Sequence, residues 1–122
     1  MAETPEERPL HVFAHARAGD KGNSVNISVI PYYAGAYDHL LSEVTEDRVR
    51  ALLSHRSIGK VHRYEVPGLP ALNFVIEDAL EGGVNLSLGL DGHGKSLSFL
   101  VLTLAVRIPL KFAHQAARLQ VL

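Results

Sequence analysis

The chain has 122 residues, of which 47% are hydrophobic and 20% are charged, and its formal net charge is −1. This length fits one domain with a modest core, and the near-neutral charge gives no electrostatic reason to expect a nucleic acid or an anionic membrane as partner. Cysteine is absent, which excludes disulfides and thiolate metal sites and favours a cytoplasmic protein. The apolar segment 97–108 is shorter than the roughly twenty residues of a membrane span, so no span is expected.

The N-terminal half begins with an acidic, proline-punctuated segment, residues 1–9, which predicts a flexible tail. Apolar residues then alternate with polar ones over residues 10–16 and again over residues 25–30, a period of two that predicts two strands. Pro31 is expected to end the second strand. We predict that these strands pair as a hairpin.

The segment between these strands, residues 15–26, combines two glycines with a dense run of charged and hydrogen-bonding side chains. It predicts a polar loop at one end of a sheet, where binding and catalytic groups concentrate. The candidate ligand-binding residues of this stretch are Arg17, Gly19, Asp20, Lys21, Gly22, Asn23 and Asn26.

The middle of the chain predicts two short helices, the first formed from Ala36 onward and the second starting after Thr45 as its N-cap. Residues 60–66 predict a third strand. A longer helix is predicted over residues 72–80, because apolar side chains recur there at helical spacing between Pro70 and Gly82.

The last part of the chain predicts a fourth strand over residues 84–90 and a turn over residues 91–95. Residues 96–108 fit a helix or a strand, with propensity leaning to strand, and residues 111–122 can form a short helix. The sum is one α+β domain over residues 10–108, with a mainly antiparallel sheet and helices packed on one face, followed by a C-terminal extension of residues 109–122.

Several segments form a distinctive combination: residues 15–23 with Asn26 beyond them, residues 63–67 and 71–75, the Gly82-Gly83-Val84 run, and Leu90-Asp91 with Gly94-Lys95. In this order and spacing they resemble the AtuA-like small domain. The resemblance implies a ferredoxin-like sandwich, a partnership with an AtuA-type large chain, and a setting in acyl-CoA or terpenoid-acid catabolism (acyclic terpene utilisation). It also implies a helix, rather than a strand, over residues 96–104.

The polar stretch can be read as a pocket for an anion or a carboxylate, since Arg17 and Lys21 supply charge and glycines let backbone N–H groups approach a ligand. It lacks the Gly-Lys-Ser/Thr order of a nucleotide P-loop. The alternative is a plain turn in which Asp20 and Asn23 bond to backbone groups. Asn73 and Gly83 are further candidate ligand-binding neighbours.

His15 and Asp20 are weak candidates for an acid–base pair, with Lys21 as an electrophile. An exposed strand-end histidine beside a turn aspartate is the favoured interpretation. The seven histidines show no His-Glu-x-x-His spacing, so no metal site is expected, and no cofactor is implied.

Three functions remain open at this stage. The leading hypothesis is a noncatalytic or half-site accessory subunit that works with an AtuA-type large chain or as a homo-oligomer. The second is a small enzyme acting on a carboxylate or a CoA thioester. The third is a ferredoxin-like module that binds a small acid.

Overall fold

A four-stranded sheet with strand order β2-β3-β5-β4 forms the centre of the protein. The structure is a computed structural model that describes residues 6–21, 24–54, 59–77 and 97–114. The strands are β2 (Ala14–Lys21), β3 (Ser24–Pro31), β4 (Val61–Glu65) and β5 (Leu72–Ile76). All neighbouring strands run antiparallel, which confirms the predicted sheet type and the predicted strand over residues 60–66.

Strands β2 and β3 form a long hairpin, which occupies most of the predicted loop. Their register pairs Ala14 with Pro31 at one end and Lys21 with Ser24 at the other. The hairpin is confirmed, but the loop expected between a strand ending at residue 16 and one starting at residue 25 is wrong over residues 17–21 and at Ser24, which are strand. The polar side chains of this stretch alternate with alanines, which is the pattern of a strand with one polar face. Residues 22–23, between the strands, lie outside the described residues.

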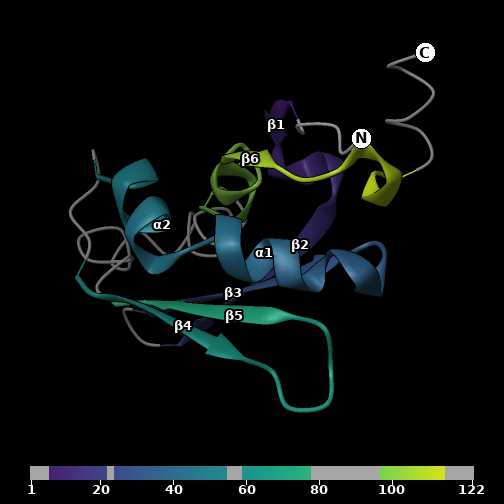
Figure 1. Cartoon of the computed structure of the whole chain (residues 1–122). Coiled ribbons are helices and arrows are strands. Elements are labelled where there is room, and N and C mark those ends of the chain that lie inside the picture. Colours follow the sequence, from purple (N-terminus) through teal and green to yellow (C-terminus); the bar gives the residue numbers. More distant parts are fainter. Residues whose placement is uncertain (1–5, 22–23, 55–58, 78–96, 115–122) are drawn as a thin grey trace.

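Helices α1 (Tyr37–Glu43) and α2 (Glu46–Leu52) follow the hairpin, and Figure 1 shows both on one side of the sheet. A 3₁₀ turn, Ala34–Ala36, leads into α1. The side chain of Thr45 accepts a hydrogen bond from the backbone N–H of Arg48 at 3.2 Å, which is the N-cap that the sequence predicts. Two short helices packed on one face are therefore confirmed.

The helix predicted from Leu72 onward is wrong, because Leu72–Ile76 form β5 in the interior of the sheet. Leu72, Phe74 and Ile76 are fully buried while Asn73 and Val75 are partly exposed, a period of two. The apolar residues also fit a helical spacing, but the aromatic and β-branched run Phe-Val-Ile favours a strand. Pairing with β3 on one side and β4 on the other then fixes the extended form. Residues 78–80 lie outside the described residues.

Residues 97–108 contain a helix and a strand in succession. Residues 97–101 are helical, as the family resemblance implies, and β6 (Ala105–Arg107) follows. Strand β6 pairs with β1 (Glu7–Pro9) in a separate two-stranded sheet on the helix side of the main sheet (Figure 1). Glu7–Pro9, assigned to the flexible tail by the sequence, are thus a strand held by its pairing.

The segment after β1 turns instead of continuing as the predicted strand. Leu10–Val12 form a 3₁₀ turn, in which the N–H of Phe13 donates to the carbonyl of Leu10 at 2.9 Å. This turn buries Leu10, Val12, Phe13 and Ala14 together, which a strand with alternating faces would not do. A second 3₁₀ turn, Leu110–Phe112, opens the C-terminal extension.

Several sequence predictions fall on residues outside the described part. They are the strand of residues 84–90, the turn of residues 91–95, the Gly82-Gly83 run and the part of the predicted helix 111–122 beyond residue 114. The described start of that helix is a 3₁₀ turn, Leu110–Phe112, instead of an α-helix. Among the described residues, no helix combines the length and the apolar character needed to cross a membrane.

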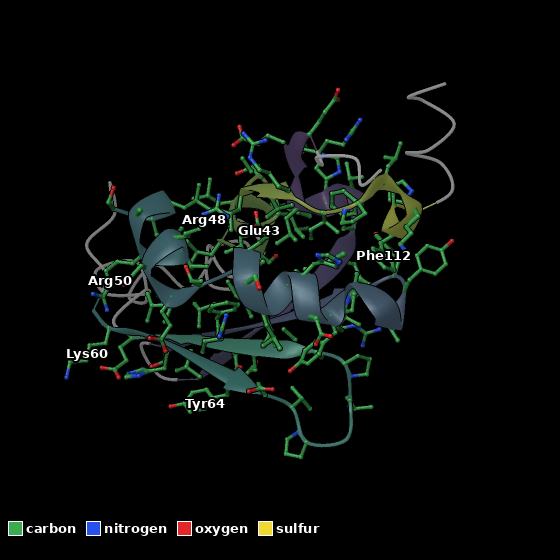
Figure 2. The ribbon with its side chains drawn as sticks, viewed as in Figure 1. Glu43, Arg48, Arg50, Lys60, Tyr64 and Phe112 are labelled. Atoms are coloured by element: carbon green, nitrogen blue, oxygen red, sulfur yellow. The ribbon has the colours of Figure 1, made fainter. Side chains whose placement is uncertain are left out.

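One hydrophobic core joins the main sheet to the elements above it. Fully buried side chains come from β3, β5, both helices, residues 97–101 and β6. Hydrogen bonds also link these layers. Arg48 donates to the carbonyls of Glu43 and Ala105 (Figure 2). The side chain of Glu43 accepts from the backbone N–H of Arg107 at 2.7 Å. The result is an α+β, ferredoxin-like architecture that leaves the other side of the main sheet without a described layer.

Candidate functional site

The face of the main sheet that points away from the helices, here called the outer face, carries most of the described candidate residues. In a strand, successive side chains point to opposite faces. Since Leu72, Phe74 and Ile76 face the helices, their neighbours and the residues paired with those neighbours form the outer face. Its members are His15, Arg17, Gly19, Asn26, Ser28, Ile30, His62, Tyr64, Asn73 and Val75.

One row of this face crosses all four strands and is entirely polar. Register places Arg17, Ser28, Asn73 and Tyr64 side by side in that order. The hydroxyl of Ser28 donates to Oδ1 of Asn73 at 3.2 Å, which leaves the amide N–H groups of Asn73 as donors. Tyr64 is 53% exposed and projects away from the helices in Figure 2. The row therefore offers hydrogen-bond donors and one positive charge to an approaching partner or ligand.

The neighbouring row contains Gly19, Asn26, Val75 and His62. Asn26 is exposed, and a side chain at Gly19 would meet no atom within 4 Å. His62 Nε2 lies 2.6 Å from Glu77 Oε2, so the imidazole is held by a carboxylate at the end of β5. Both side chains are partly open to solvent.

The structure brings together four residues that the sequence named as candidates: Arg17, Gly19, Asn26 and Asn73. The sequence placed Arg17 and Gly19 on a loop, Asn26 at the start of the strand after it, and Asn73 on a helix. In the structure they lie on three adjacent strands of one face. Sheet register, rather than loop geometry, makes them neighbours.

The remaining candidates are not joined into a catalytic set. Asp20 and Lys21 are part of β2, where their backbones pair with Val25 and Ser24. Gly22, Asn23 and Gly83 lie outside the described residues. His15 and Asp20 are five positions apart on an extended strand, which separates their Cα atoms by about 17 Å. This distance argues against the proposed acid–base pair.

The ring of His15 instead contacts an aromatic group at the start of the connection to α1. Its centroid lies 5.5 Å from that of Tyr32, and Tyr32 lies 5.1 Å from the ring of His114. These are ordinary aromatic contact distances. His15 therefore helps to pack the C-terminal extension against the hairpin.

Sequence reasoning missed three outer-face residues: Ser28, His62 and Tyr64. The predicted strands contained all of them, and the alternation of those strands gave a usable signal. This signal was obscured because residues 72–76 were assigned to a helix. The predicted sheet therefore lacked β5, the strand that lies between β3 and β4.

A polar cavity of about 340 Å³ lies on the opposite side of β4, lined by Thr45, Glu46, Asp47 and Arg63. Its charged groups already serve the fold. Arg63 donates to the last carbonyls of the α1 turn, Leu41 at 2.7 Å and Val44 at 2.9 Å, where a cation stabilises the helix C-terminus. The carboxylate of Glu46 accepts from the backbone N–H of Arg63 at 2.7 Å. We assign this cavity a structural role.

An open groove lies beside the connection between β4 and β5. Here the N–H of Leu69 donates to the carbonyl of Val66 at 3.1 Å and Gly68 has a φ of 77°, as expected for a type II turn with Pro67 before the glycine. Tyr37 donates to Glu65 at 3.0 Å across one end of this groove. Partial burial, followed by this bond and the nearby negative charge, raises the pKa of Tyr37 above its ordinary value of 10.0.

Among the described residues, no three histidine, aspartate or glutamate side chains gather closely enough to hold an ion. The outer face offers hydrogen-bond donors, among them the guanidinium of Arg17 and the amide N–H groups of Asn73.

A sequence model of the AtuA ferredoxin-like domain matches residues 8–107. The chain belongs to the AtuA ferredoxin-like domain family. This confirms both the resemblance seen in the sequence and the ferredoxin-like fold class. No curated protein and no solved structure matches the chain.

The AtuA ferredoxin-like domain includes all four strands of the main sheet as well as α1 and α2. The whole outer face therefore belongs to the domain itself. Residues 108–122 lie beyond the match, so His114, which packs on Tyr32, belongs to the extension.

Proposed function

We propose that this AtuA ferredoxin-like domain is an accessory subunit that works with an AtuA-type large chain, in the cytoplasm, in acyl-CoA or terpenoid-acid catabolism. The observation that carries the proposal is the outer face of the sheet, whose entirely polar row of Arg17, Ser28, Asn73 and Tyr64 is covered by no described element. The outer face is, in this proposal, the surface presented to the large chain.

The composition of the outer face supports a protein partner. Arginine and tyrosine are the residue types that most often anchor protein interfaces, and Arg17 and Tyr64 stand at opposite ends of one row. Between them the Ser28–Asn73 hydrogen bond fixes an amide in place before binding, which lowers the entropy lost on association. This role needs no catalytic residues.

The enzyme alternative is weaker because the described residues do not assemble a nucleophile, a base and an oxyanion site. The His62–Glu77 pair is the one described histidine–carboxylate contact, and it lies on an open surface. The isolated chain should therefore not turn over an acyl-CoA. Turnover that His15→Ala or His62→Ala abolishes would contradict the accessory role.

A binding experiment with matched charge reversals tests the proposal. The chain is co-expressed with an AtuA-type large chain, and the tagged complex is purified. Arg17→Glu should reduce co-purification at least tenfold, because it reverses the charge of the outer face. Arg50→Glu, on the exposed side of α2 (Figure 2), should leave it unchanged. Equal yields from both variants, or no complex with the natural chain, would contradict the proposal.

A small carboxylate is a second candidate ligand for the same row. The Oδ1 atom of Asn73 is occupied by Ser28, so its N–H donors and the guanidinium of Arg17 flank Ser28 from two sides. Charge-assisted bonds of this kind hold carboxylates well. Titration calorimetry with short-chain acids should show binding that Arg17→Ala weakens while the far-ultraviolet spectrum stays unchanged. Absence of heat with the natural chain would rule this candidate out.

A further inference from the structure

Strand β2 is an edge strand whose outer side has no described partner. The main sheet ends with β2 on one side and β4 on the other. Strand β2 is long, and Arg17, Ala18 and Gly19 are exposed at its centre. A long, flat edge strand with small side chains is a ready template for a further strand.

The hydrogen bonds of the hairpin show which backbone groups of β2 bond to β3 and which point away from it. The N–H of Tyr32 donates to the carbonyl of Phe13 at 3.0 Å, so Phe13 and Tyr32 form a hydrogen-bonded pair. In an antiparallel ladder such pairs alternate, so His15, Arg17 and Gly19 also bond to β3. The N–H and C=O groups of Ala14, Ala16 and Ala18 consequently point to the open edge.

The opposite edge of the sheet is protected. The outward N–H of Arg63 on β4 donates to Glu46 of α2 at 2.7 Å, and α2 packs along that strand. A carboxylate placed there occupies the group that another strand would need. Within the described part of the chain the two edges therefore differ, and β2 is the edge that keeps outward backbone groups for pairing.

We infer that two copies of the chain pair antiparallel through β2, forming one continuous eight-stranded sheet around a two-fold axis. An interface between identical strands is self-complementary, because the outward groups of one copy meet the same groups of the other. This pairing does not depend on the large chain, so the proposed function and this dimer can fail separately.

The two-fold symmetry allows few registers, and charge selects among them. An axis at Arg17 would place the two arginines directly opposite each other, which is destabilising. An axis at Ala16 would use only residues 14–18 of each copy. An axis at Ala18 pairs residues 15–21 and places Arg17 opposite Gly19 of the second copy, where no atom lies within 4 Å of the Cβ position. The Ala18 register is the one that satisfies length and charge together.

This register makes the outer face continuous across the two copies. The row of Tyr64, Asn73, Ser28 and Arg17 is extended by Gly19, Asn26, Val75 and His62 of the second copy. Arg17 then lies beside a row that contains Asn26 of the second copy. The polar row of each copy thus continues into a row of the other copy that contains Asn26.

Single cysteines test the register cleanly because the chain has none of its own. In Ala18→Cys the two cysteines would form a hydrogen-bonded pair with Cα atoms about 5.5 Å apart, a distance that a disulfide spans. In Ala16→Cys they would be about 14 Å apart. Mild oxidation should convert most of Ala18→Cys, and little of Ala16→Cys, into a covalent dimer. Equal cross-linking of both variants would overturn the register.

Ala18→Pro gives an independent test of edge pairing. Proline removes an N–H that the hairpin does not use, so the monomer should keep its circular dichroism spectrum. Light scattering of the natural chain should give the mass of two chains, and Ala18→Pro should give the mass of one. A natural chain that stays monomeric at high concentration, or an Ala18→Pro variant that stays dimeric, would overturn the dimer.

Discussion

The two faces of the main sheet are made from the same strands and have opposite characters. On β3, Val25, Ile27 and Val29 are fully buried beneath the helices, while Asn26 and Ser28 between them reach the outer face. The inner face gains its stability from apolar area removed from water. The outer face keeps polar groups available, at little cost to the fold. The inner-face residues hold the domain together, while Asn26 and Ser28 on the outer face stay at least partly open to solvent.

The largest expected difference comes from two adjacent residues of β5. Phe74→Ala should lower the free energy of unfolding by about 3–5 kcal/mol, because it empties a fully buried position on the inner face. Asn73→Ala, on the outer face, should cost under about 1 kcal/mol, the value of its bond to Ser28. Urea denaturation measures both. Similar losses for the two variants would contradict the division between faces.

The next effect compares two arginines: Arg63 of β4, which bonds to the end of α1, and Arg50 of α2, which is exposed. Arg63→Ala removes two hydrogen bonds to the end of α1 and should cost about 1.5–3 kcal/mol. Arg50→Ala, at an exposed position of α2, should stay within about 0.5 kcal/mol of the natural chain. Thermal unfolding of both variants checks the ranking. An equal loss for Arg50→Ala would show that net charge, rather than the α1 contact, matters.

A smaller effect is expected at the start of α2. Thr45→Ala deletes the acceptor for the N–H of Arg48 and should cost about 1 kcal/mol. Thr45→Ser retains an acceptor and should recover most of the loss. A Thr45→Ser variant as unstable as Thr45→Ala would indicate packing by the methyl group instead of capping.

The smallest effect is a pH dependence at Tyr37. Because its pKa is raised above 10.0, the unfolded chain loses this proton first as the pH rises. Its contribution to stability is therefore complete below about pH 10 and declines through the pKa of the folded state. Subtracting the ultraviolet titration curve of Tyr37→Phe from that of the natural chain isolates the titration of Tyr37. The difference curve should have its midpoint above pH 10.0. A midpoint at or below that value would contradict the Glu65 contact.

Local signals were sufficient for α1 and α2 and insufficient for β5. Thr45 and the acidic residues after it predicted the start of α2 correctly, because a cap depends on residues within one turn. Residues 72–76 satisfied both helical and strand spacing, and their pairing with β3 and β4 decided the outcome. The sequence could not show these partners.

The sequence predicted which residues belong to the candidate site more accurately than it predicted how they are arranged. Arg17, Asn26 and Asn73 were grouped as neighbours, and the structure places them on one face. The dense polar composition suggested a loop because the alternating alanines of β2 are small and only weakly indicate a buried face. Tyr64 and His62 joined the site through sheet register, which depends on contacts distant in sequence.

Cysteine footprinting of the two faces tests the central claim most directly. Tyr64→Cys places a thiol on the outer face, and Ser42→Cys places one on the exposed side of α1. Both variants are treated with a maleimide, with and without an AtuA-type large chain. The account predicts that the large chain slows labelling at position 64 at least tenfold and leaves position 42 unchanged. Protection at position 42 with free labelling at position 64 would contradict it.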